Sequence, residues 1–88
     1  MNGVLLAAIL EYLCRHRIVG ALKLADDMMK RKDVRQALGL AYVPRLGTEE
    51  WWRIQNVVMK AVKKLEEHGL VSYNPASGFV RWEGGRCV

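Results

Sequence analysis

The chain has 88 residues, of which 51% are hydrophobic and 26% charged, fractions that are typical of an ordinary globular protein. A chain of this length forms one domain with one modest core, which excludes a large multi-substrate enzyme and a multi-pass membrane protein. Its net charge of +5 favours a polyanionic partner, either nucleic acid or an acidic membrane surface. We expect a single domain over residues 1–88, with its core between residues 4 and 82.

Residues 4–15 are predicted to form the first helix, which is apolar on nearly every side except at Glu11. Its apolar run is too short to cross a membrane and lacks the features of a secretory signal, which predicts a cytoplasmic protein. One small domain covers one face of such a helix, so either irregular loops or a second copy of the chain covers the other. We expect a homodimer, with an interface formed by four side chains of this helix: Leu5, Leu6, Ile9 and Leu13.

The two cysteines, Cys14 and Cys87, are too few for a disulfide scaffold and do not have the spacing of a metal motif. They are interpreted as two reduced thiols. If the first helix lies at a dimer interface, an intermolecular disulfide through either cysteine is an alternative.

The chain continues with a short β-branched stretch at residues 17–19, which predicts a brief strand. Residues 21–31 follow the period of a helix. The buried face of this helix is predicted to contain Leu22, Ala25, Met28 and Met29. The stretch 32–47 is the least regular and is interpreted as an inserted loop, in which Asp33 is placed to cap a short helix through Leu38.

The strongest helical pattern begins at Thr48, a typical N-cap residue, and runs to His68, before the terminator Gly69. Its apolar stripe has helical spacing over four turns. The stripe comprises Trp51, Ile54, Val58, Ala61 and Leu65, widened by Val57 and Val62. Residues 70–73 and 79–82 are rich in β-branched and aromatic side chains, and the turn formers between them predict a hairpin. The tail, residues 83–88, is predicted to be flexible.

The segment Leu65-Glu66-Glu67-His68-Gly69-Leu70-Val71, directly before the predicted hairpin, resembles the end of the recognition helix in the winged helix-turn-helix family. Leu24-Ala25-Asp26-Asp27 is similar to the first element of that motif. The resemblance covers residues 4–82 and implies an α+β fold, mainly α, with three or four helices and a two-stranded wing. The family joins its second and third helices by a tight turn, whereas this chain places residues 32–47 between them.

The resemblance implies that the polar face of the helix 48–68 reads double-stranded DNA, since an α-helix fits the major groove. Arg53, Asn56 and Lys60 are expected nearest the base edges, with Lys63 and Lys64 on phosphates. Further phosphate contacts are expected from Arg81 on the hairpin and from a second basic cluster, Lys30, Arg31, Lys32 and Arg35. The alternative for these charges is an ordinary solvated surface.

Trp52 has three interpretations: it stacks on a base, packs under the loop 32–47, or lies in a dimer interface, and packing is favoured. No catalytic, metal-binding or phosphate-loop motif is present, so we expect no enzyme, no cofactor and no metal. The sequence therefore predicts a cytoplasmic, nucleoid-associated homodimer that binds double-stranded DNA as a transcriptional regulator or genome-organising protein. The alternatives are a protein-interaction module without nucleic-acid binding, and RNA binding by the same face.

Overall fold

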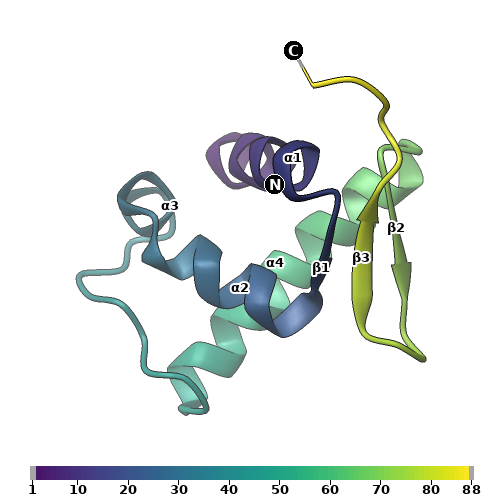
Figure 1. Ribbon diagram of the computed structural model, residues 1–88. Coiled ribbons are helices and arrows are strands. Elements are labelled where there is room, and N and C mark those ends of the chain that lie inside the picture. The colour runs from purple at the N-terminus through teal and green to yellow at the C-terminus, as the bar shows by residue number, and fades with distance from the viewer. Residues whose placement is uncertain (1, 88) are drawn as a thin grey trace.

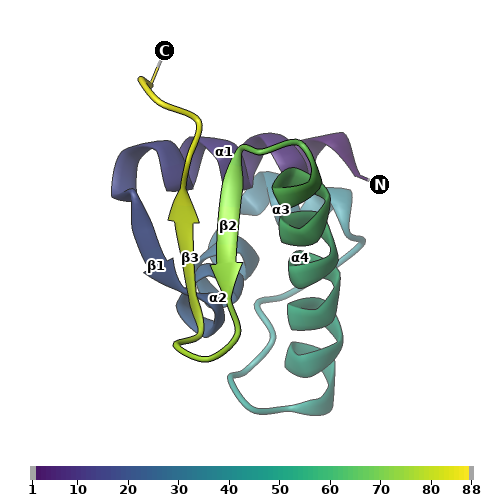
Figure 2. The same cartoon turned by 90° about the vertical axis from the view of Figure 1, so that its right-hand side faces the viewer.

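The computed structural model describes residues 2–87 as an α+β fold of four helices and one three-stranded antiparallel sheet (Figure 1). The helices are α1 (Gly3–His16), α2 (Ala21–Lys30), α3 (Lys32–Ala37) and α4 (Glu49–Glu67). The strands are β1 (Ile18–Gly20), β2 (Val71–Asn74) and β3 (Phe79–Trp82). Figure 2 shows α1 lying across the top of the molecule, above the sheet and above α4.

Polar side chains fix where the two longest helices begin. The Asn2 side-chain oxygen accepts hydrogen bonds from the first amides of α1, those of Val4 and Leu5, at 2.9 and 3.2 Å. Thr48 Oγ1 accepts from the Trp51 amide at 3.2 Å and caps α4, as its sequence position predicts. Gly69 has φ +74°, a conformation that favours glycine, and the helix ends before it.

The sheet has strand order β1-β3-β2, so β3 lies between the other two strands. The predicted hairpin is confirmed as β2 and β3, but the prediction of a two-stranded unit is corrected, since β1 pairs with β3 as a third strand. Val19 lies opposite the fully buried Val80 in this pairing. Burial of this apolar pair favours adding β1 to the hairpin, at the position where the sequence predicts a brief strand.

The apolar helix α1 is covered mainly by its own chain. Leu5, Ile9 and Leu13 have no exposed surface, and α1 packs against α2, α3 and α4. The predicted dimer interface is therefore corrected for these three side chains, and only Leu6 among the four is partly exposed. The homodimer itself stays a prediction, which size-exclusion chromatography with light scattering would check.

The buried stripe of α2 is shifted from the predicted one. Leu22 is 51% exposed, which makes its predicted core position wrong, whereas Leu24 is fully buried. The side chains that face the core share the spacing of a single helical face. They are Ala21, Leu24, Ala25, Met28 and Met29. Leu22 lies outside that face, and its apolar side chain is therefore at the surface.

The segment 32–47 begins with the six-residue helix α3, which confirms the predicted short helix. The predicted cap at Asp33 is wrong, because Arg31 holds the N-cap position and Asp33 lies within the first turn. Val34 anchors α3 in the core, and Asn2 Nδ2 donates to the Ala37 carbonyl at 3.0 Å. The remaining residues run irregularly from α3 to the start of α4, and Pro44 is buried among them. Residues 32–47 are therefore helical at one end and tied to both α1 and the core.

The C-terminal tail, predicted to be flexible, is attached to the body of the protein. Cys14 and Cys87 lie side by side, with their Cα atoms 5.5 Å apart, a separation that a disulfide within one chain can bridge. The Gly85 carbonyl accepts hydrogen bonds from Arg17 Nη1 at 2.8 Å and from Trp82 Nε1 at 2.7 Å. Residues 83–87 thus lie against α1 and β3, and Val88 lies outside the described residues.

A hydrogen bond between Tyr12 and Asp27 joins α1 to α2, with 2.5 Å between the phenol oxygen and Asp27 Oδ2. Burial raises the pKa of Tyr12 to about 12, and the hydrogen bond and negative charge of Asp27 act in the same direction. The folded protein therefore holds this proton where the unfolded chain loses it. Stability from this group is present below pH 10 and is lost as the pH rises towards about 12.

We expect a spectrophotometric titration of the three tyrosines to contain one late step near pH 12 in the folded protein. The step disappears in Tyr12→Phe, because the other two tyrosines do not make this hydrogen bond. A late step that persists in Tyr12→Phe would contradict the assignment. The titration is repeated in denaturant, where all three phenols ionise near their ordinary pKa.

Candidate nucleic-acid interface

The two faces of α4 differ sharply in exposure. Its apolar side is buried against the rest of the protein, as the sequence predicts. This buried stripe consists of Trp51, Ile54, Val58, Ala61, Val62 and Leu65. The opposite side is exposed and bears all five candidate residues of the helix. These are Arg53, Asn56, Lys60, Lys63 and Lys64, here called the α4 outer face.

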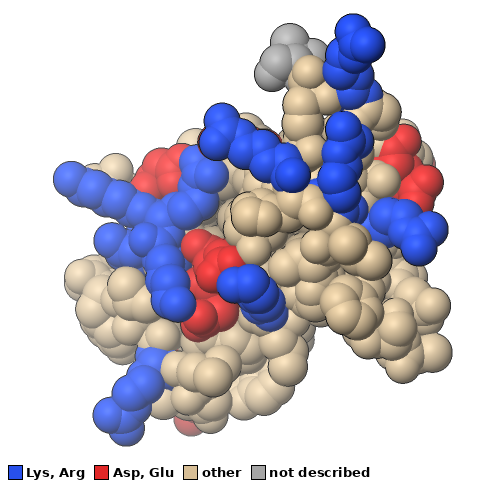
Figure 3. Space-filling view, viewed as in Figure 1, with Lys and Arg blue, Asp and Glu red and all other residues tan. Residues whose placement is uncertain are grey.

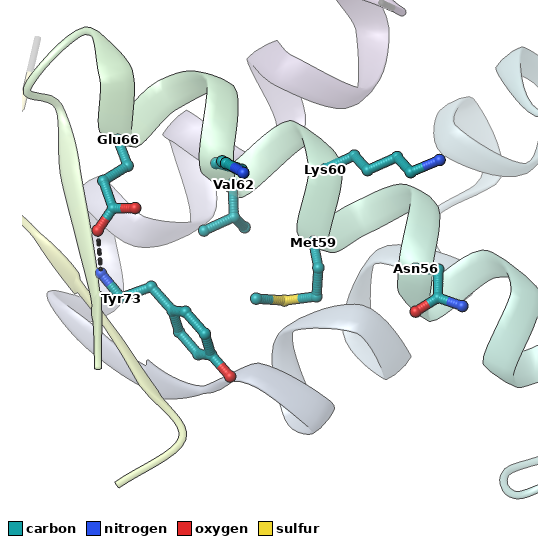
Figure 4. A pocket seen from close by; sticks show the side chains of 7 residues that line it. Asn56, Met59, Lys60, Val62, Glu66 and Tyr73 are labelled. Carbon is teal, nitrogen blue, oxygen red and sulfur yellow. Dashed lines mark hydrogen bonds between the residues drawn. The ribbon is translucent and has the colours of Figure 1, made fainter. Parts of the chain in front are cut away.

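A groove of about 510 Å³ runs between α4 and β2 (Figure 4). Its lining consists of Asn56, Met59, Lys60, Val62, Lys63, Glu66 and Tyr73. Figure 4 shows the Met59 and Tyr73 side chains turned towards each other, whereas Asn56 and Lys60 extend from α4 at the other end. The groove therefore combines an apolar wall with the polar groups of three predicted site residues.

One end of this groove is acidic. Glu66 accepts a hydrogen bond from the Tyr73 amide through Oε2 at 3.0 Å, which connects α4 to β2 (Figure 4). A carboxylate at this position repels phosphate groups. An anionic ligand is therefore favoured at the Asn56 and Lys60 end, towards the middle of the helix.

Arg53 is exposed, but part of its guanidinium is already engaged. Its Nε donates to Glu50 Oε2 at 3.3 Å and its Nη2 donates to Glu50 Oε1 at 2.8 Å. The hydrogen bond to Glu50 raises the pKa of Arg53 above its ordinary value. Both residues line a second hollow of about 620 Å³ on the α4 surface, together with Glu49, Trp52 and Asn56.

Trp52 is 47% exposed beside Arg53, so it is packed only in part. Its ring meets the buried Trp51 ring edge to face, with 5.0 Å between the centroids. The rest of its surface is exposed next to the α4 outer face. This ring contact is with the preceding residue of α4, so the predicted packing of Trp52 under the loop 32–47 stays a prediction.

Part of the second basic cluster is paired with neighbouring acids: Lys30 with Asp26, and Arg31 with Asp33 and Glu11. Lys30 Nζ lies 3.0 Å from Asp26 Oδ2, and this hydrogen bond raises the pKa of Lys30. Arg35 Nη1 donates to the Met29 carbonyl at 3.1 Å. Lys32 is exposed and forms no ion pair within residues 2–87. In Figure 3 blue side chains gather over α3 at the left, with red ones among them.

The predicted site residues do not form one continuous surface. Lys30, Lys32 and Arg35 belong to the end of α2 and to α3, which lie across the molecule from β2 (Figure 1). Arg81 is exposed on the outer side of the sheet, opposite Ile18 and Ser72 in the strand register. Only the α4 residues share one helical face, and three of them border the groove beside β2.

Comparison of the chain with protein-family models, with curated proteins and with solved structures gave no match. None of the helices within residues 2–87 combines the length and apolar character that crossing a bilayer requires. Over the same residues, no group of three or more His, Cys, Asp or Glu side chains is placed to hold a metal ion.

Two features of this surface do not follow from the sequence reasoning above. Tyr73 forms a wall of the groove only because the hairpin docks against α4, a contact between separate elements. The pairing of Glu50 with Arg53 is local, and its i,i+3 spacing is a signal that a search of the helix for ion pairs would find.

Proposed function

We propose that this chain is a winged helix-turn-helix protein that binds double-stranded DNA through the α4 outer face. Its role is that of a small transcriptional regulator or genome-organising protein. The order of the elements supports the proposal, because α4 follows α2 along the chain and leads through Gly69 into the hairpin β2–β3. In this reading α4 is the recognition helix and the hairpin is the wing, to which β1 adds a third strand.

The observation that carries the proposal is the grouping of donors on the α4 outer face. Asn56, Lys60 and Lys63 border one groove, and Arg53 lies one turn before Asn56 on the same exposed side. Arginine and lysine pair with guanine edges and phosphates, and asparagine pairs with adenine. A single exposed helix therefore offers both kinds of contact that a DNA duplex requires.

The lysines of this face have little else to bind. Lys60, Lys63 and Lys64 are exposed and form no ion pair within residues 2–87. Their charge is therefore available to phosphates, in contrast to that of Lys30, which Asp26 neutralises. We place the main phosphate contacts on α4 and give the cluster around α3 a minor share.

The experiment is fluorescence anisotropy with a labelled random-sequence duplex across a salt series. We expect a dissociation constant of about 10⁻⁴–10⁻⁶ M near physiological salt, and a log–log salt slope of roughly −3 to −6 for a handful of phosphate contacts. Duplex RNA should compete poorly, because its deep, narrow major groove does not admit a helix. Absence of duplex binding at low salt would contradict the proposal.

Exposed apolar side chains favour a second candidate, a protein-interaction module. Tyr42 and Leu46 in the loop before α4 are 62% and 68% exposed, and Trp52 is 47% exposed. Exposed apolar surface often marks a protein interface. On this reading duplex DNA does not bind at low salt, and one stoichiometric protein partner is lost when Leu46 and Trp52 are replaced by alanine.

A further inference from the structure

The contact between Glu50 and Arg53 leaves one edge of the guanidinium free. An arginine has five N–H donors, one on Nε and two on each Nη. Glu50 accepts hydrogen bonds along the side edge of the guanidinium, from the Nε hydrogen and from one hydrogen of Nη2. The end-on edge, formed by Nη1 and the second hydrogen of Nη2, makes no hydrogen bond within residues 2–87.

That free edge has the geometry that recognises guanine. Two parallel N–H groups of an arginine fork pair with the O6 and N7 atoms of guanine in the major groove. The Arg53 side chain is 59% exposed on the α4 outer face, so the edge is accessible. Asn56, the next polar residue along this face, lines the same hollow.

The carboxylate also restrains the arginine before any ligand arrives. A long, unpaired arginine loses side-chain entropy when it is fixed on a base, and that loss weakens binding. Glu50 is the less exposed partner, at 33%, and stands on the helix one turn before Arg53. The two hydrogen bonds that Arg53 donates to this one carboxylate hold both the position and the plane of the guanidinium.

We infer that Glu50 is a positioning residue that presents the end-on edge of Arg53 to a guanine base, so that this pair sets the sequence preference of the protein. The inference rests on the proposed function and adds a named base contact to it. Lys63 and Lys64 are expected on phosphates, and their contribution to affinity is therefore largely independent of sequence.

The inference separates two effects of Glu50 on binding. Its negative charge repels phosphates and lowers the affinity for any duplex. Its hydrogen bonds to Arg53 orient the guanidinium and so favour duplexes with guanine at one position. Removing the carboxylate should therefore raise affinity for random DNA while lowering the preference for guanine. If the carboxylate only neutralised Arg53, its removal would raise affinity without lowering the guanine preference.

The experiment selects bound sequences from a randomised duplex library and then measures affinities for the selected site and for its variant without the guanine. For the wild-type chain we expect a discrimination of about tenfold or more at one guanine. In Glu50→Ala this discrimination falls severalfold while random-duplex affinity rises. In Arg53→Lys, which keeps the charge but lacks the fork, the guanine preference falls as well.

Glu49→Ala is the matched control. Glu49 precedes Glu50 in the same helical turn, is exposed, and makes no hydrogen bond to Arg53. Its removal takes away the same charge, so random-duplex affinity should rise and the guanine preference should persist. Circular dichroism and thermal melting establish that each variant is folded.

Two results would overturn the inference while the proposed function stands. The first is duplex binding by the wild-type chain with no guanine preference that depends on Arg53. The second is a full guanine preference in Glu50→Ala. Absence of any duplex binding by the wild-type chain would overturn the proposed function and the inference together.

Discussion

Replacing Lys60 and Lys63 together by glutamate should abolish most duplex binding by this protein. Each lysine that contacts a phosphate contributes about one unit to the salt slope, and a loss of about tenfold in affinity per contact is expected. The two substitutions also introduce repulsion. At low salt we expect a fall in affinity of about a hundredfold or more, and a salt slope that is shallower by about two.

The fold should tolerate this change. Both side chains are exposed on α4, and neither forms an ion pair in the described part of the chain. The buried stripe on the opposite side of the helix is not altered. Thermal melting should therefore remain close to that of the wild-type chain, and a loss of binding can be assigned to the surface.

A double variant with the same change in net charge provides the control. Arg15 and Arg86 border a shallow depression between α1 and the C-terminal tail, away from the groove beside β2. Arg15→Glu/Arg86→Glu should lower duplex affinity only slightly. An equal fall in both double variants would show that net charge, and not the α4 outer face, determines binding. Unchanged affinity in Lys60→Glu/Lys63→Glu would contradict the assigned face.

The parts of the fold that the sequence predicted well depend on local chemistry. Thr48 and Gly69 bound α4 through capping and backbone conformation, which involve only neighbouring residues. The stripe from Trp51 to Leu65 follows from helical period alone. The same period separates the α4 outer face from the core, so the exposure of Asn56, Lys60 and Lys63 was predictable.

The features that the sequence did not predict depend on contacts between distant segments. β1 joins the sheet because β3 returns beside it, and Cys14 meets Cys87 because the tail follows β3 back to α1. Helix α1 has apolar residues on most sides, and this pattern does not reveal how many elements of the same chain will cover it. The predicted dimer interface was corrected for this reason.

The candidate site shows the same division. Single residues on the α4 outer face were found from their spacing, whereas their partners were not. The groove needs Tyr73 from the hairpin, and Lys30 of the second basic cluster is paired with Asp26 within α2. Charge along a sequence therefore overestimated the basic surface, because ion pairs inside one helix and between helices remove part of it.

Replacing Trp51 by alanine should destabilise the protein more than any other alanine substitution on α4. Trp51 is the largest fully buried side chain, with no exposed surface. Deletion of a buried tryptophan costs about 3–5 kcal/mol through lost transfer energy and the remaining cavity. A domain of this kind has a total stability of roughly 5–15 kcal/mol, so the variant should be partly unfolded at modest denaturant concentrations.

Trp51 also has a polar contact that connects α4 to α2. Its Nε1 donates to Asp26 Oδ1 at 3.0 Å, and the same carboxylate pairs with Lys30. Burial opposes ionisation of Asp26, but the hydrogen bonds from Trp51 and Lys30 outweigh it and hold the pKa of the carboxyl below its ordinary value. Trp51→Phe keeps most of the apolar volume and loses this hydrogen bond, so we expect an intermediate cost of about 2 kcal/mol.

The neighbouring Trp52 is a matched control for both variants. It has the same side chain on the same helix, but it is 47% exposed, and its ring meets the Trp51 ring edge to face. Trp52→Ala should cost about 1 kcal/mol or less. Urea denaturation followed by circular dichroism measures all three variants against the wild-type chain. Equal destabilisation by Trp51→Ala and Trp52→Ala would contradict the packing of α4 described above, because only Trp51 faces the core.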